Sequence, residues 1–195
     1  ETPDGQQNEL IIELRELITK YRCANQDVPL LFAVCAPCQP FTKISKKKLS
    51  DKRREGRAKD TNLLQESTKF ISEFLPEFII SENVEGIRKS QHGETWGKFC
   101  QSLEELGYVV GSKVVCASRF GIPQYRKRSI LLAVKKELVK EERFADLLKT
   151  ELLLPEADPN SAMVSVTNAI GHLPPLEAGE AHAQIPNHRT RNLSE

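Results

Sequence analysis

The stretch PLLFAVC, from Pro29 to Cys35, is continuously apolar, and Ala36, Pro37 and Cys38 follow it directly. A short apolar run bounded by polar residues is typical of a β-strand that is buried on both faces of its sheet. Such strands occur in α/β proteins, where helices cover the sheet. This stretch therefore predicts an α/β fold and places Cys38 just beyond the end of a strand.

The chain on either side of this stretch alternates between helical and strand patterns. Apolar residues recur at three-to-four spacing in segments that predict helices over residues 8–22, 63–75 and 96–106, and a charged helix is expected over 137–153. Short apolar runs predict strands over residues 77–81, 108–117 and 129–134. Gly107 is a natural end for the third helix. The alternation is the pattern of an α/β sheet.

The overall composition excludes several classes of protein. The chain has 195 residues, of which 28% are charged and 39% hydrophobic, and its formal net charge is +1. These proportions are typical of an ordinary globular protein. With so small a net charge, the protein as a whole has no strong electrostatic field that would attract nucleic acid or a membrane. No apolar stretch approaches the roughly 20 residues of a membrane helix, and the polar start does not resemble a signal peptide. We therefore expect a cytoplasmic protein, nucleoid-associated if bacterial, with no membrane partner.

Two segments differ in composition from the rest. Nine Lys and Arg residues and only two acidic residues lie between Thr42 and Lys59, where the apolar pattern stops, and we expect a basic loop there. From Pro155 onward, Pro and Gly recur at short intervals, which indicates a boundary. We expect one α/β domain over residues 1–154 and a different region over residues 155–195.

Chemically active side chains follow the predicted strands. In open α/β sheets, ligands bind beyond the carboxyl ends of the strands, and Cys38, Glu82, Arg126 and Arg128 occur at such points. A thiol, a carboxylate and two guanidiniums suit a site in which a nucleophile attacks a ring whose nitrogen and carbonyl are hydrogen-bonded. Taken singly, each residue also has an ordinary interpretation, as an inert thiol, a turn carboxylate or a solvated cation.

Three short motifs stand in a specific order along the chain. They are PCQPF at residues 37–41, ENV at residues 82–84 and GIPQYRKR at residues 121–128. Together they resemble the cytosine-C5 DNA methyltransferases, in which a Pro-Cys-Gln segment carries the nucleophile and is followed by Glu-Asn-Val and by Gln-x-Arg-x-Arg after a Gly-x-Pro turn. The segment NAIGHLPPLEAGE, at residues 168–180, is similar to the approach to that family's target-recognition region.

This resemblance implies a fold, a reaction and a partner. The fold would be a doubly wound, mostly parallel sheet of the S-adenosylmethionine-dependent type, with the catalytic domain in residues 1–154 and the start of the target-recognition region in residues 155–195. The thiolate of Cys38 would add to C6 of a cytosine flipped out of double-stranded DNA, and C5 would then take a methyl group from S-adenosyl-L-methionine. Glu82 would hold N3 and the exocyclic amine, and Arg128, with Arg126, would hold O2 and the nearby phosphate.

The cofactor site is where the chain departs from the family pattern. Pro37 and Leu63 match positions that border the cofactor in the family. The family's aromatic-x-Gly-x-Gly loop, however, lies far upstream of Pro-Cys-Gln, and Gly5 is the only glycine in residues 1–28 of this sequence. A second polypeptide or missing segments would have to supply that loop. We therefore expect a chain incomplete at both ends, which alone binds the cofactor weakly or not at all.

Other readings of the same residues lead to different functions. Cys35 and Cys38 are spaced as in the Cys-x-x-Cys motif of thiol redox proteins. The chain has five cysteines, an odd number, so at least one can be a free, reactive thiol. The family also suggests a tRNA cytosine-C5 methyltransferase or a non-catalytic DNA-binding relative. We predict no metal site, because the single Cys-x-x-Cys has no second cysteine pair.

Overall fold

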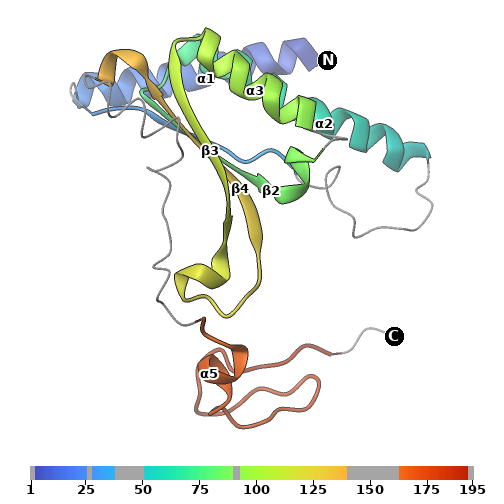
Figure 1. The fold of residues 1–195 in the computed structure, drawn as a ribbon. Helices are drawn as coiled ribbons and strands as arrows, with labels where there is room; N and C mark the ends of the chain where they lie inside the picture. Colours follow the sequence, from blue (N-terminus) through green and yellow to red (C-terminus); the bar gives the residue numbers. More distant parts are fainter. Residues whose placement is uncertain (1–2, 26–27, 38–50, 90–92, 140–162, 193–195) are drawn as a thin grey trace. The chain divides into compact units, whose positions relative to one another are not determined.

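The computed structural model describes residues 3–25, 28–37, 51–89, 93–139 and 163–192 (Figure 1). The chain divides into two compact units, of which the first comprises Glu1–Cys116 with Lys127–Ala157 and the second Ala117–Arg126 with Asp158–Glu195. None of the described helices has the length and apolar character needed to cross a membrane.

The described residues of the first unit form a four-stranded sheet with the strand order β1-β2-β4-β3. Its strands are β1 (Leu31–Val34), β2 (Phe78–Val84), β3 (Tyr108–Cys116) and β4 (Lys127–Lys135). Strand β1 runs parallel to β2, whereas β4 is antiparallel to both β2 and β3.

The α/β prediction is confirmed, but the described sheet is mixed where we expected a mostly parallel one. The reason lies in the connection between β3 and β4, which is a short turn through the 3-10 helix η3 (Ala117–Phe120). A short connection can only join antiparallel neighbours, because a parallel pair needs a longer crossover.

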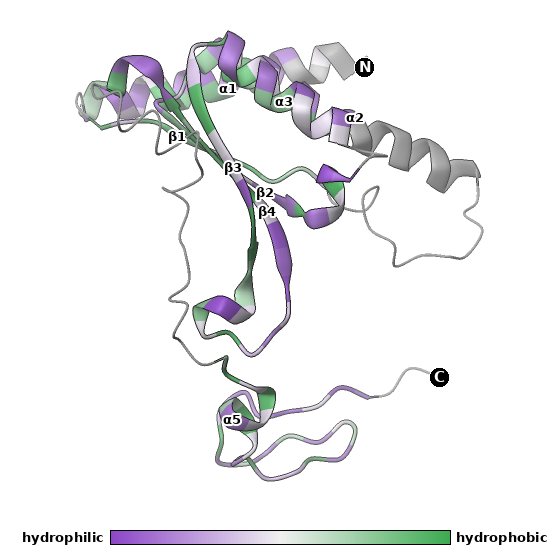
Figure 2. Cartoon of the chain, in the orientation of Figure 1, coloured by the Kyte–Doolittle hydropathy of each residue, from purple (hydrophilic) through white to green (hydrophobic). Residues whose placement is uncertain are grey.

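Two helices cover one face of this sheet. They are α2 (Asp51–Phe74) and α3 (Gly93–Glu105), which pack against each other and against the strands (Figure 1). Their apolar residues meet the apolar residues of β2 and β4 in one core, and Figure 2 shows how green hydrophobic segments alternate with purple hydrophilic ones along these elements. The buried members of this core are Leu64, Ile71, Ile79, Ile87, Trp96, Phe99, Leu103, Tyr108, Leu131 and Ala133.

The start of α2 corrects the prediction of a basic loop over residues 42–59. The helix begins at Asp51, so residues 51–59 are helical, and the part of the predicted loop before Asp51 lies outside the described residues. Lys, Arg, Glu and Ala are good helix formers, and a helix can extend beyond its packed part without an apolar stripe. Hydrophobic periodicity alone therefore placed the start of this helix too late.

The end of β2 corrects a second prediction. We expected the strand to stop at Ser81 with Glu82, Asn83 and Val84 in the following loop, but all three belong to the strand. Val84 still pairs with Arg128 of β4, so the antiparallel ladder continues to the end of the motif. The strand accommodates these polar residues because the Glu82 side chain is partly exposed on one face, whereas the buried Asn83 side chain on the other face donates a hydrogen bond to the carbonyl oxygen of Ala36.

Other boundaries agree closely with the sequence patterns. Helix α1 runs over Pro3–Ala24 where residues 8–22 were predicted. Helix α3 ends two residues before Gly107, whose φ of 87° is readily adopted only by glycine. The charged helix predicted over 137–153 falls mostly outside the described residues. The described part of that range, residues 137–139, overlaps the 3-10 helix η4 (Lys136–Leu138).

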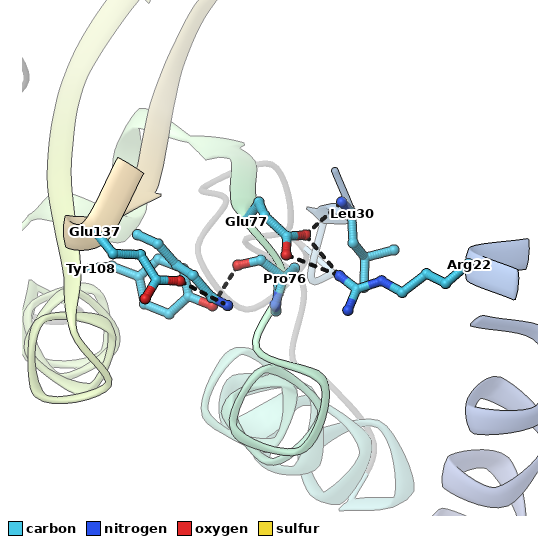
Figure 3. A network of polar contacts seen from close by, with 7 residues as sticks. Arg22, Leu30, Pro76, Glu77, Tyr108 and Glu137 are labelled. Carbon is cyan, nitrogen blue, oxygen red and sulfur yellow. Dashed lines mark hydrogen bonds and ion pairs between the residues drawn. The ribbon is translucent and has the colours of Figure 1, made fainter. Parts of the chain in front are cut away.

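A polar network joins α1 to the amino-terminal end of β2 (Figure 3). The Glu77 carboxylate accepts hydrogen bonds from Arg22 Nη2, at 2.9 and 3.0 Å, and from the backbone N–H of Leu30, at 2.6 Å. Burial alone would raise the pKa of Glu77, but backbone hydrogen bonds, chiefly from Leu30, and the charges of Arg22 and Lys135 together lower that pKa below its ordinary 4.5. Glu77 therefore stabilises the fold in its ionised form.

Tyr108 is buried beside this network. Its hydroxyl donates a hydrogen bond of 2.7 Å to the carbonyl oxygen of Pro76 (Figure 3). Burial, followed by the charges of Glu77 and Glu137, raises the pKa of Tyr108 to about 12. The phenol stays neutral at physiological pH and joins the start of β3 to the segment between α2 and β2.

The second unit is rich in turns. Its helix α5 (Val166–Ile170) begins with a capping box, in which the Ser165 side chain accepts from the backbone N–H of Asn168 and the Asn168 side chain accepts from the backbone N–H of Ser165. Ala181 and Arg189 form an isolated antiparallel bridge. Side-chain and backbone hydrogen bonds thus hold this unit where regular structure is scarce.

Candidate active site

Glu82 and Arg128 come together on one face of the sheet. Val84 pairs with Arg128 in the ladder between β2 and β4, so Glu82 and Arg128, two residues apart in register, project to the same side. Their side chains form an ion pair with 2.6 Å between Arg128 Nε and Glu82 Oε1. Arg128 Nη1 also donates a 2.8 Å hydrogen bond to the carbonyl oxygen of Lys127, which fixes the guanidinium plane.

The two partners differ in their exposure. The Arg128 side chain is 20% exposed, whereas that of Glu82 is 42% exposed. The arginine is thus held against the sheet while the carboxylate faces solvent. A carboxylate beside a guanidinium fits a planar ligand that carries a hydrogen-bond donor and an acceptor along one edge.

Ser81 and Asn83 lie on the opposite face and bind the end of β1. Ser81 Oγ donates a hydrogen bond of 2.7 Å to the carbonyl oxygen of Val34, and Asn83 Nδ2 donates one of 3.1 Å to the carbonyl oxygen of Ala36. Both side chains are buried. The Glu-Asn-Val motif therefore contacts the segment that leads directly to the Pro-Cys-Gln motif.

The nucleophile position follows this tethered segment. Because β1 and β2 are parallel, their carboxyl ends lie at the same edge of the sheet, and Pro37 is exposed just beyond β1. Cys38 itself lies outside the described residues. Cys35, the other member of the suggested redox pair, is free and exposed.

The two other predicted site residues that the structure describes lie on elements different from those of Glu82 and Arg128. Leu63 is a 41% exposed residue of α2, and Arg126 is an exposed residue of the second unit whose carbonyl oxygen accepts a 2.9 Å hydrogen bond from Ala117 N–H.

The described residues do not amount to a cofactor or metal site. No glycine-rich turn occurs among them next to Pro37 or Leu63. Within the part of the chain that the structure describes, no three His, Cys, Asp or Glu residues are placed as metal ligands would be.

Sequence reasoning named Asn83 only as part of a motif and passed over Ser81. A usable signal was present, because polar residues two apart in an otherwise apolar strand share one face. A polar side chain on a buried sheet face must find a hydrogen-bond partner. The pattern therefore indicated that Ser81 and Asn83 need hydrogen-bond partners, but not which groups those partners are.

Comparison with known proteins decides the family. The model of the C-5 cytosine-specific DNA methylase family matches residues 8–191, which is nearly the whole chain. The chain belongs to the C-5 cytosine-specific DNA methylases. This family uses S-adenosyl-L-methionine as methyl donor, and the resemblance seen in the three motifs is thereby confirmed.

Individual relatives agree with this assignment. The chain is 40% identical over 106 residues to the type II methylase M.HgiDII of Herpetosiphon aurantiacus, a match that covers 54% of this chain and 28% of that protein. It is 31% identical over 161 residues to the type II methyltransferase M1.HphI of Haemophilus parahaemolyticus, covering 81% of this chain and 38% of that protein. The chain therefore spans about a third of the length of these relatives.

A solved structure supports the fold. A crystal structure described as a DNA modification methyltransferase from an E. coli prophage matches with a TM-score of 0.50 and 25% sequence identity. The match covers 83% of this chain and 40% of that chain.

Proposed function

We propose that this chain carries the cytosine-activating part of a DNA cytosine-C5 methyltransferase, with Cys38 as its nucleophile. The observation that carries the proposal is the pairing of Glu82 with Arg128 at 2.6 Å, at the same edge of the sheet as the end of β1 that leads to Cys38. Family membership supports a cytosine as the reacting group.

Glu82 and Arg128 complement one edge of a cytosine. That edge presents the exocyclic amine as a donor, N3 as an acceptor and O2 as a second acceptor. Glu82 would accept from the amine and hold a proton at N3, while Arg128 would donate to O2. Their adjacency in the folded chain matches the adjacency of these atoms on the base. Arg126, on the second unit, would contact O2 or the neighbouring phosphate.

The chemistry follows from these contacts. The Cys38 thiolate would form a bond to C6, and the electron pair of the C5–C6 double bond would move toward C5 while negative charge spreads over the ring. The proton at N3, held by Glu82, and the Arg128 charge at O2 would stabilise that charge as it develops. S-Adenosyl-L-methionine, when bound, supplies the methyl group that such an electron-rich C5 accepts. A base would then remove the C5 proton, and the C6–S bond would break to restore the ring and release the thiolate.

The substrate of this reaction would be double-stranded DNA. The Cys38 thiolate would attack C6 from the face of the ring, which the neighbouring base pairs cover in a duplex, so the target nucleotide has to be flipped out first. The basic residues between Thr42 and Lys59 would supply sequence-independent phosphate contacts, which contribute affinity and not base choice.

We propose the domain division as part of this function. Residues 1–154 would be catalytic, and residues 155–195 would lead into the target-recognition region. Strand β1 is an edge of the described sheet, so further strands of a doubly wound sheet can pair with it. The complete enzyme would unite this chain with a glycine-rich cofactor segment, on the same polypeptide or on a second one.

The direct test replaces Glu82 by Gln in the complete enzyme. Glu82→Gln keeps the shape but loses the charge that holds the N3 proton, so single-turnover methyl transfer to cytosine DNA should slow by about 10²–10⁴-fold. Glu85→Gln is the matched control, because Glu85 lies three residues further along and forms an ion pair with Lys89 at 3.4 Å. Full activity of Glu82→Gln would contradict the role of Glu82. Faster methylation of tRNA than of DNA by the wild type would favour the RNA alternative.

A further inference from the structure

The segment from Ser81 to Asn83 places three polar side chains on alternate faces of β2. Ser81 is completely buried and Asn83 is 1% exposed, whereas the Glu82 side chain is 42% exposed and faces Arg128. Successive side chains of a strand point to opposite faces. One short segment therefore carries the proposed catalytic carboxylate on one face and two buried hydrogen-bond donors on the other.

The two buried donors hydrogen-bond the β1 segment at and just beyond the point where the main-chain ladder between β1 and β2 ends. Val34 is the last residue of β1 and pairs with Ser81, so Ala36 lies beyond the strand. Asn83 Nδ2 reaches the Ala36 carbonyl oxygen at 3.1 Å, and Ser81 Oγ reaches the Val34 carbonyl oxygen at 2.7 Å.

The Asn83 amide is itself fixed in orientation. Its Oδ1 accepts a hydrogen bond of 2.9 Å from the backbone N–H of Val84. With the oxygen committed in this way, the nitrogen is the atom directed at Ala36. Both side chains are buried, so water does not compete for these bonds, and each bond holds its backbone partner more firmly than an exposed one would.

We infer that Ser81 and Asn83 are positioning residues for the nucleophile. They hold the backbone at Val34 and Ala36, four and two residues before Cys38, while Glu82 stands between them on the same strand. The distance between the attacking thiolate and the base held by Glu82 would thus be set by one rigid element. This inference rests on the proposed function. A small displacement of a nucleophile slows a reaction strongly because only a narrow range of geometries is reactive.

Ser129 provides a matched control. It pairs with Asn83 across β2 and β4, so it lies on the same buried face, and it is completely buried. Among the described residues, its Oγ finds no hydrogen-bond partner. Ser129→Ala therefore removes the same group from the same face without releasing β1.

The experiment measures covalent capture of duplex DNA that contains 5-fluorocytosine by the complete enzyme with S-adenosyl-L-methionine, under single-turnover conditions. Fluorine at C5 cannot leave as a proton does, so the Cys38 adduct accumulates. The rate constant reports on positioning, and the amplitude reports on the fraction of folded enzyme. Ser81→Ala and Asn83→Ala should each lower the rate constant by about tenfold at nearly full amplitude. Ser129→Ala should leave both unchanged, and Ser81→Thr, which keeps the hydroxyl, should restore most of the rate.

The other outcomes separate this inference from the proposed function. A reduced amplitude with a wild-type rate constant, or equal slowing by Ser129→Ala, would show that Ser81 and Asn83 only support the fold and would overturn the inference alone. No capture by the wild type would overturn the inference together with the proposed function.

Discussion

Arg128 Nε lies 2.6 Å from Glu82 Oε1 because the ladder between β2 and β4 pairs Val84 with Arg128 and so brings the two side chains to one face. The two residues are 46 positions apart in the chain. With Glu82 partly exposed, an ion pair of this kind adds at most about 1 kcal/mol to stability. We therefore interpret the pairing as a functional arrangement.

Replacing Arg128 should impair the reaction more than DNA binding. Arg128→Ala removes the charge at O2 and should slow single-turnover methyl transfer by about 10²–10³-fold, whereas Arg128→Lys, which keeps the charge without the planar fork, should recover part of the rate. The DNA affinity and its salt dependence are the second measurement. If Arg128 only bound a phosphate, Arg128→Ala would lower the salt slope by about one while the rate at saturating DNA stayed normal.

The Glu77 network predicts a specific dependence of stability on pH. The pKa of Glu77 in the folded protein is lower than 4.5, so its contribution to the free energy of unfolding is complete above that pH and is lost as the pH falls through the folded-state pKa. Glu77→Gln should destabilise the fold by about 1–3 kcal/mol at neutral pH and weaken this acid dependence. Denaturant unfolding between about pH 3 and pH 7 measures both effects.

Glu73→Gln is the control for Glu77. Glu73 forms an ion pair with Arg15, and the side chains of both are more exposed than that of Glu77. This change should alter stability by less than about 1 kcal/mol. An equal effect of the two substitutions would contradict the role given to the Leu30 and Arg22 contacts.

Cysteine reactivity should separate structural thiols from accessible ones. Burial, and then the charge of Glu104, raises the pKa of Cys100 from 9.0 to about 11. At pH 8 this lowers its thiolate fraction by about a hundredfold, so Cys100 should react with iodoacetamide far more slowly than the exposed Cys23 and Cys35. Mass spectrometry of tryptic peptides measures the three rates. Equal labelling of Cys100 in the native protein would contradict its partial burial against the core.

Much of the first unit could be predicted from sequence because local patterns and tertiary packing agree there. Helix α3 is an example, since its apolar residues, including Trp96 and Phe99, form the buried face and Gly107 ends the segment. The direction of β4 could not be predicted from its own residues. It depends on the short turn after β3, whereas an apolar strand pattern is the same for parallel and antiparallel pairing.

The pairing of Glu82 with Arg128 involves two residues that the sequence motifs had named, whereas the supporting contacts of the candidate site could not be predicted. Motif resemblance named Glu82 and Arg128, and the structure shows that they meet. The contacts of Ser81 and Asn83 with β1 depend on the register of two parallel strands, which only the fold defines. Nothing in the local pattern around residue 81 specifies which carbonyl lies opposite its hydroxyl.

The most direct test of the central claim is covalent capture of 5-fluorocytosine DNA by the complete enzyme and its cysteine variants. If Cys38 is the nucleophile, the wild type and Cys35→Ser should both form an adduct that survives denaturation, and Cys38→Ser should form none. An adduct that persists in Cys38→Ser would contradict the account, and loss of methyl transfer in Cys35→Ser would instead favour a redox pair formed by the two cysteines.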